Sequence, residues 1–278
     1  MKYDQSLCAV IIPFYEDKLS KKKLNIIKHN LKILKEWPIY FVVPESNKIY
    51  AENLFLNNLS IKVMTFNDFY FASITGYNKL LTNIEFYKKF ENYKYILICQ
   101  LDVIVFKDEI KKWCSQNYSY VGAPWIKSNE QKQVLEKPKF FGVGNGGFSL
   151  RKIKDFIRIL KYKKNRSFFF GYVISLIKTN NYLEFLKQMI KFLLLRHKNT
   201  EKFWTNVNED FVWGLGANYI DKLFKVPSKD QALKFSFEVM PSYLYKLNNN
   251  DLPFGCHAFE KYESDFWKII FKNNNINL

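Results

Sequence analysis

The sequence predicts an α/β protein in which a mixed, mostly parallel sheet is flanked by helices. Short apolar runs alternate with segments of helical periodicity through the N-terminal part of the chain. This alternation indicates strand–helix–strand units whose strands pair in parallel. The chain has 278 residues, of which 48% are hydrophobic. That length and composition are enough for one large domain, 1–278, with a substantial buried core.

The expected elements of the N-terminal part follow the apolar spacing. Leu7–Phe14 is a first buried strand, and Lys21–Lys35 follows as a helix whose apolar residues recur at helical intervals. Further strands are expected at Ile39–Val43, Ile61–Thr65 and Tyr95–Cys99, and further helices at Ala51–Leu56 and Ile74–Phe90. Because helices separate the strands, we expect both faces of the sheet to be covered.

The pattern changes in the C-terminal part of the chain. Tyr118–Trp125 is expected to be a strand entering a loop, Phe140–Gly147 a glycine-rich segment, and Ile153 the start of a helix. Residues 154–203 form a basic, apolar insertion, in which Leu183–Leu194 carries one apolar helical face opposite lysines. That helix either lies on an anionic membrane surface or packs on the core with a solvated lysine face.

The charge of the chain limits its partners. The formal net charge is +17, with 43 basic and 26 acidic residues. Such an excess favours anionic partners, such as nucleotides or a phospholipid surface. Arginine occurs only at Arg151, Arg158, Arg166 and Arg196. Because arginine is the usual reader of base edges, we expect no specific nucleic-acid binding.

Cysteine usage and the start of the chain predict its location. The cysteines form no Cys-x-x-Cys pair and lie at Cys8, Cys99, Cys114 and Cys256. This pattern is typical of free thiols in a reducing compartment. The N-terminus lacks the apolar region of a signal peptide, and no uninterrupted apolar stretch reaches the roughly 18 residues of a spanning helix. We therefore expect a cytoplasmic protein, either free or bound peripherally to the inner face of the cytoplasmic membrane.

A single carboxylate stands out at the end of the most apolar strand. Tyr95–Cys99 is followed by Gln100-Leu-Asp102, after which apolar residues resume through Phe106. A carboxylate in such a frame is costly unless it is paired or bound to a cation, and the carboxyl end of a parallel strand is where α/β folds bind ligands. Asp102 therefore either holds a divalent metal or caps the next turn.

Further segments bear candidate chemistry. Phe141–Leu150 is rich in glycine and matches neither a Walker A loop nor G-x-G-x-x-G. Its glycines either allow close approach of the backbone to a ligand or form a structural turn. Glu209 and Asp210 open an apolar segment, either as helix-capping acids or as a general base and its partner. His257 is either a core histidine or, with Asp102, a ligand of Mn²⁺ or Mg²⁺.

Taken together, the ordered segments resemble the nucleotide-sugar-dependent glycosyltransferases of the GT-A fold. The closest resemblance is to a bacterial family with Q-L-D, G-A-P-W, N-G-G-F-S-L-R, N-E-D and G-C-H segments. They stand here as Gln100–Asp102, Gly122–Trp125, Asn145–Arg151, Asn208–Asp210 and Gly255–His257. The resemblance implies a GT-A fold with a donor-binding half, 1–125, and an acceptor half, 126–278. It also implies inverting, metal-assisted sugar transfer from a UDP- or GDP-sugar to a hydroxyl of a glycan or a lipid-linked acceptor.

The resemblance implies roles for individual residues. Asp102 occupies the last position of the D-x-D motif and binds Mn²⁺ or Mg²⁺ with His257. Asp210 matches the base of the x-E-D motif, and Glu209 orients the acceptor hydroxyl or the helix. The implied nucleotide-sugar-binding residues are Pro13, Phe14, Tyr15, Lys79, Gln100, Leu101, Asp102, Asn145, Gly146 and Gly147. The implied acceptor-binding residues are Trp125 and Trp213.

One position departs from the motif. The D-x-D sequence begins with Gln100, a neutral residue and a weaker ligand of hard metals than a carboxylate. The substitution keeps open a non-catalytic nucleotide- or glycan-binding protein on the same fold. A third interpretation, a basic membrane-surface protein, rests on the net charge alone.

Overall fold

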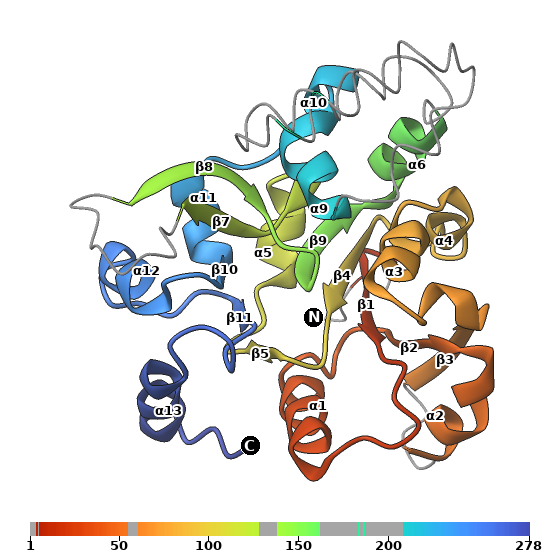
Figure 1. Cartoon of the computed structure of the whole chain (residues 1–278), viewed down its shortest axis with the longest axis horizontal. Coiled ribbons are helices and arrows are strands. Elements are labelled where there is room, and N and C mark those ends of the chain that lie inside the picture. Colours follow the sequence, from red (N-terminus) through yellow and green to blue (C-terminus); the bar gives the residue numbers. More distant parts are fainter. Residues whose placement is uncertain are drawn as a thin grey trace.

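The centre of the molecule is a mixed sheet with the strand order β3-β2-β1-β4-β9-β6 (Figure 1). The computed structural model describes residues 4, 6–54, 61–127, 138–161, 183, 186 and 208–278. Strands β1 to β4 run parallel to one another, whereas β9 is antiparallel to both β4 and β6. The prediction of a mixed, mostly parallel α/β sheet flanked by helices is therefore confirmed.

The N-terminal elements lie where the apolar spacing predicts them. They are β1 (Cys8–Pro13), α1 (Lys21–Ile33), β2 (Ile39–Pro44), α2 (Lys48–Leu54), β3 (Ile61–Phe66), α3 (Ile74–Leu81), α4 (Ile84–Lys88) and β4 (Tyr95–Cys99). The helix expected over Ile74–Phe90 is wrong in one respect, because it is two helices. Asn83 ends the continuity: its side chain accepts a hydrogen bond from the backbone of Glu85 and so begins α4.

The later elements build the rest of the molecule. They are β5 (Val103–Val105), α5 (Ile110–Ser115), β6 (Tyr120–Val121), β7 (Ala123–Lys127), β8 (Lys139–Gly144), β9 (Phe148–Lys152), α6 (Ile153–Lys161), α9 (Glu209–Phe211), a π-helical turn (Val212–Gly216), α10 (Ala217–Ile220), α11 (Lys229–Phe235), β10 (Ser236–Phe237), α12 (Pro241–Leu247), β11 (Gly255–His257) and α13 (Ser264–Asn273). The expected strand Tyr118–Trp125 is two strands, because β6 joins the central sheet while β7 pairs with β8.

The glycine-rich segment is mostly a strand, β8, and its glycines accommodate a tryptophan. A Cβ atom on Gly144 would lie 1.9 Å from the ring of Trp125, and one on Gly142 would lie 3.0 Å from it. A Cβ atom on Gly214 would meet the carbonyl of Val143 at 1.9 Å. These glycines therefore let a buried indole, β8 and the π-helical turn pack closely.

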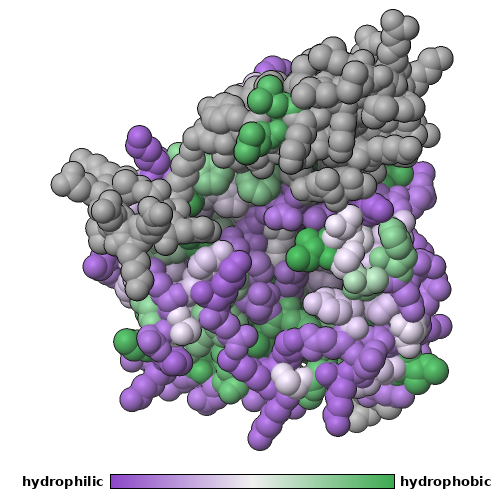
Figure 2. Space-filling view, in the orientation of Figure 1, coloured by the Kyte–Doolittle hydropathy of each residue, from purple (hydrophilic) through white to green (hydrophobic). Residues whose placement is uncertain are grey.

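Apolar side chains cover both faces of the central sheet. On one face they come from α1, α2 and α5, and on the other from α3, α4, α6 and α10. A further cluster lies around the small sheet β10-β11-β5 and helices α12 and α13. Strands of both expected halves share the central sheet, because β9 pairs with β4. The surface in view is mainly hydrophilic outside the residues drawn in grey (Figure 2).

Two expectations concern membranes and thiols. Among the described residues, we find no helix with the length and hydropathy needed to cross a bilayer. All four cysteines are buried and free. Most of the insertion expected at 154–203 lies outside the described residues; inside them are α6 to Lys161, and Leu183 and Leu186.

Candidate active site

The candidate site begins where the direction of the strand order reverses. Strand β1 pairs with β2 on one side and with β4 on the other. The carboxyl ends of β1 and β4 therefore lie side by side, with Pro13 and Tyr15 near Gln100 and Asp102. Open α/β sheets bind ligands at this kind of position, because the chains diverge there and leave a crevice.

The antiparallel strand β9 brings the glycine segment to the same place. Cys99 at the end of β4 is paired with Phe148 at the start of β9. One residue further, the backbone N–H of Gln100 donates a hydrogen bond to the carbonyl of Gly147 at 2.9 Å. Asn145 before it has a φ of 112° and accepts a hydrogen bond from the N–H of Gly147 at 3.0 Å. The strained backbone therefore turns this segment into the crevice.

The small sheet aligns three ionisable side chains from distant parts of the chain. His257 on β11 is paired with Val103 on β5, the residue after Asp102. On the other side of β11, Phe237 is paired with Cys256, which places Glu238 beside His257. His257 Nε2 lies 3.2 Å from Asp102 Oδ1, and its Nδ1 lies 3.3 Å from Glu238 Oε1.

The two carboxylates set the protonation of the imidazole. Burial acts to lower the pKa of His257, but hydrogen bonds to Asp102 and Glu238 outweigh it and raise that pKa to about 10. Burial likewise acts to raise the pKa of Asp102, and the hydrogen bond and charge of His257 lower it below its usual value. Without a bound cation, Asp102 and His257 are therefore an ion pair.

A glycine is required beside this pair. A Cβ atom on Gly147 would lie 2.1 Å from Nε2 of His257. No side chain fits in that space unless the imidazole moves. Gly147 thus lets the backbone of the glycine segment and the imidazole approach one another.

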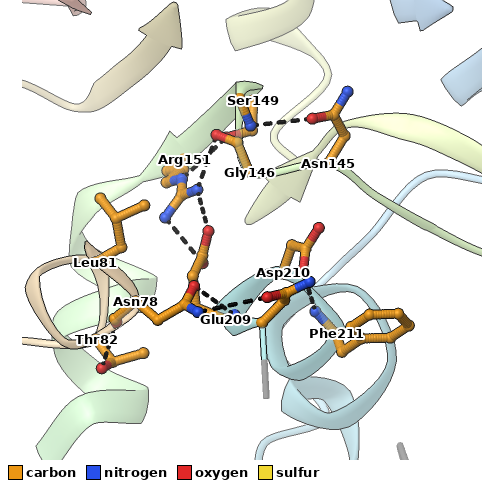
Figure 3. A network of polar contacts seen from close by, with 12 residues as sticks. Asn78, Leu81, Thr82, Asn145, Gly146, Ser149, Arg151, Glu209, Asp210 and Phe211 are labelled. Atoms are coloured by element: carbon orange, nitrogen blue, oxygen red, sulfur yellow. Dashed lines mark hydrogen bonds and ion pairs between the residues drawn. The ribbon is translucent and has the colours of Figure 1, made fainter. Parts of the chain in front are cut away.

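A buried ion pair fixes the N-E-D segment. Arg151 on β9 binds both carboxylate oxygens of Glu209 on α9, at 2.8 and 3.1 Å (Figure 3). Arg151 also donates to Ser149 and Tyr87 at 3.0 Å each. The side chains of Arg151 and Glu209 are 0% and 3% exposed. Glu209 is therefore held as an anchor of α9, since both of its oxygens bind the guanidinium.

Asp210 has a different environment from its neighbour. Its carboxylate accepts a hydrogen bond from the backbone of Phe211 at 2.9 Å and is directed away from Arg151 (Figure 3). Burial, followed by the negative charges of Glu209 and Glu238, raises the pKa of Asp210 to about 7. A carboxyl group with that pKa can hold or release a proton near neutral pH, as a general base must.

These groups line one cleft of about 870 Å³. The structure brings together most of the residues expected at the site. They are Pro13, Tyr15, Gln100, Leu101, Asp102, Asn145, Gly146, Gly147, Glu209, Asp210 and His257. The cleft combines a carboxylate–imidazole pair, a carboxyl group with a near-neutral pKa and a glycine wall, so it offers ligands for a cation and a group that can accept a proton.

Four residues expected at the site are not among those that line the cleft. Phe14 is 1% exposed and packs on Phe41, so its side chain fills the core. Trp213 is 0% exposed and packs on Phe156. Trp125 is 7% exposed and stacks on Phe211. The ammonium of Lys79 lies over the ring of Phe69, 4.7 Å from its centre, and is not among the cleft residues.

Sequence reasoning missed several cleft residues. Glu238 follows a two-residue strand and has no sequence signal, because the strand pairing that places it spans distant segments. Lys23 lies in the first turn of α1 and lines the cleft. Arg151 does not line the cleft but holds Glu209, which does. It had a usable signal, since a lone arginine inside an apolar strand must be paired when it is buried.

Comparisons with solved structures find distant likenesses. Over 90% of this chain, mouse xyloside xylosyltransferase 1 has a TM-score of 0.48, 10% identity and 96% of its own chain covered. The galactosyltransferase LgtC gives 0.44 and 15%, with 86% of its chain covered. The glycosyltransferase GlyE of Streptococcus pneumoniae TIGR4 gives 0.43 and 14%, and this chain spans 54% of its length.

Sequence comparisons identify a family. Among curated proteins, none matches this chain significantly. One family profile, described as "Protein of unknown function (DUF5672)", matches residues 60–257. The match covers well over half of the chain and includes every motif from Gln100–Asp102 to Gly255–His257. The chain therefore belongs to the DUF5672 family.

Proposed function

We propose that this protein is a glycosyltransferase that moves a sugar from a nucleotide-sugar donor to a hydroxyl group of a glycan or lipid-linked acceptor. The observation that carries the proposal is the arrangement of one cleft. At the switch point of the sheet it holds the Asp102–His257 pair and, on a separate element, the partly buried Asp210. A diphosphate leaving group needs the first feature and an acceptor hydroxyl needs the second.

The residues fit a divalent cation that is shared with the donor. Asp102 and His257 offer a carboxylate oxygen and an imidazole nitrogen 3.2 Å apart, and Mn²⁺ accepts both ligand types. The described part of the chain holds no group of three or more His, Cys, Asp or Glu side chains arranged to bind a metal. The remaining ligands would therefore be phosphate oxygens and water. When bound, the cation neutralises the charge that develops on the diphosphate.

The residues on the acceptor side act through position and proton transfer. Asp210 accepts the proton of the attacking hydroxyl as that oxygen bonds to the anomeric carbon and the bond to the diphosphate breaks. A single displacement of this kind inverts the anomeric configuration. The hydroxyl becomes acidic only as the new bond forms, so the anchoring of α9 by Arg151 and Glu209 matters as much as the base itself.

Lys23 is our candidate contact for the diphosphate, in place of Lys79. Its ammonium is ion-paired with Glu16 on the cleft wall. After the larger influences of burial and His257, the charge of Lys23 also lowers the pKa of Asp102. Because Lys23 and Asp102 line the same cleft, the ammonium is placed to bind the same phosphates.

We expect Lys23→Met to weaken donor binding about tenfold, the effect of losing one charge-assisted hydrogen bond. The matched control is Lys79→Met, which removes the same charge from outside the cleft and should leave donor affinity unchanged. Calorimetric titration with the donor measures both. Equal weakening in the two variants would assign the effect to net charge and remove Lys23 as a contact.

The proposal is tested by nucleoside diphosphate release from a panel of sugar nucleotides, with Mn²⁺, with Mg²⁺ and with chelator. Slow donor hydrolysis does not depend on knowing the acceptor. We expect release from one donor, with loss of release on chelation and in Asp102→Ala. If no donor is bound or hydrolysed by the wild-type protein, the glycosyltransferase proposal is wrong.

Gln100 favours a second candidate, a non-catalytic binding protein for nucleotides or glycans. It lines the cleft where a carboxylate would assist the cation. This candidate would be supported over the enzyme if the donor binds but is neither hydrolysed nor used for transfer to any of a broad range of acceptors.

A further inference from the structure

We propose that Glu238 is a positioning residue that holds the imidazole of His257 so that Nε2 faces Asp102 as a metal ligand. The inference rests on the proposed function, because it concerns the cation that the donor would share. Glu238 lies outside every motif of the sequence and follows the short strand β10 (Ser236–Phe237).

Strand pairing places Glu238 at one edge of the ring and Asp102 at the other. In the small sheet, β11 lies between β10 and β5. Glu238 Oε1 is 3.3 Å from Nδ1 of His257, whereas Asp102 Oδ1 is 3.2 Å from Nε2. A carboxylate at Nδ1 cannot bind the same ion as Nε2, because the two nitrogens of an imidazole point in different directions. Glu238 therefore acts through His257.

The exposure of the three side chains supports this division. The side chain of Asp102 is 43% exposed, whereas those of His257 and Glu238 are 13% and 18% exposed. Gly147 packs against Nε2 so closely that a Cβ atom would lie 2.1 Å away. The ring is thus enclosed on the side of Glu238, whereas Gly147, which has no side chain, leaves space at the Nε2 edge that the ring shares with Asp102.

The chemistry requires an acceptor at Nδ1. An imidazole that binds a metal through Nε2 carries its proton on Nδ1 and needs a hydrogen-bond acceptor there. A carboxylate in that place fixes the tautomer and the ring orientation. Its removal typically lowers the metal affinity about 10- to 100-fold. Glu238 is the residue that meets this requirement here.

The experiment is Mn²⁺ binding, followed by the electron paramagnetic resonance signal of free Mn²⁺, with and without UDP. We expect Glu238→Ala to bind Mn²⁺ about 10- to 100-fold more weakly than the wild type. Glu238→Gln keeps an oxygen acceptor and should recover part of that loss. Circular dichroism and thermal unfolding show that each variant is folded.

The matched control is Glu260→Ala. Glu260 lines the same cleft but is ion-paired with Lys22, on the exposed rim. The Glu260→Ala variant removes an equal charge without changing the contacts of His257, so we expect Mn²⁺ affinity within about twofold of the wild type. Equal losses in Glu260→Ala and Glu238→Ala would overturn the inference, because the effect would then be one of charge alone.

Two further outcomes would also overturn it. One is wild-type affinity in folded Glu238→Ala, and the other is a wild-type protein that binds no Mn²⁺ under either condition. Neither outcome decides the proposed function, which is judged separately by donor hydrolysis in the wild-type protein with Mn²⁺, with Mg²⁺ and with chelator. Failure of the positioning role and failure of the transferase are thus distinguishable.

Discussion

Asp210→Asn is expected to reduce sugar transfer about 10²- to 10⁴-fold, the usual contribution of a general base. The amide keeps the shape of the side chain and its hydrogen bond from Phe211 but cannot take a proton. Donor affinity should be unchanged, because Asp102 and His257 lie on other elements. Product formation from the donor and acceptor under saturating conditions measures the loss. A near-normal rate would remove Asp210 from the mechanism.

The pKa of Asp210 gives this prediction a pH signature. Because that pKa is raised to about 7, wild-type transfer should increase as the pH rises through about 7, where the carboxyl group loses its proton. Asp210→Asn should lack that step in whatever activity remains.

Stability should change in the opposite direction to activity. A pKa raised on folding gives stability that is present below the unfolded value, 3.8, and is lost as the pH rises to the folded value of about 7. Asp210→Asn cannot ionise and avoids the loss. We expect it to be more stable than the wild type at pH 8 and similar to it near pH 4, as measured by urea unfolding.

Arg151→Met is expected to cost about 3–5 kcal/mol of unfolding free energy, because it leaves the buried carboxylate of Glu209 without its partner. The loss of the anchor should also displace α9, so transfer should fall as well. Chemical denaturation gives the stability and the product assay gives the rate.

Two controls separate the ion pair from general damage. Arg158→Met removes a guanidinium from partly exposed ion pairs with Asp155 and Asp221, and should cost about 1 kcal/mol or less. The double variant Arg151→Met/Glu209→Gln removes the unpaired charge and should regain much of the stability without regaining transfer. If the double variant is no more stable than Arg151→Met, the buried charge is not the cause.

The strands were predictable because their signal is local. Tyr95–Cys99 is apolar throughout and buried at every position, and its bounds match the expectation. The break between α3 and α4 at Asn83 was missed, because apolar periodicity continues across it and only the capping geometry shows the break.

The site was predictable where ordered motifs carried it and not where packing decided. The motifs pointed to Asp102, Asp210 and His257, which the structure brings into one cleft. Trp125 and Trp213 show the limit, since a tryptophan that binds a ligand and one that fills a core look alike in sequence. Glu238 depends on strand register, which no local pattern encodes.

That register determines which changes of chain length the family can tolerate. A long connection that contains α12 links β10 to β11, and the two strands are held in register by the pairing of Phe237 with Cys256. Residues added to or lost from this connection leave the strand pairing unchanged, so Glu238, His257 and Asp102 keep their alignment. One residue inserted within either short strand would turn the following side chains to the opposite face of the sheet. We therefore expect members of this family to differ in the length of the connection between β10 and β11, whereas the lengths of both strands stay constant.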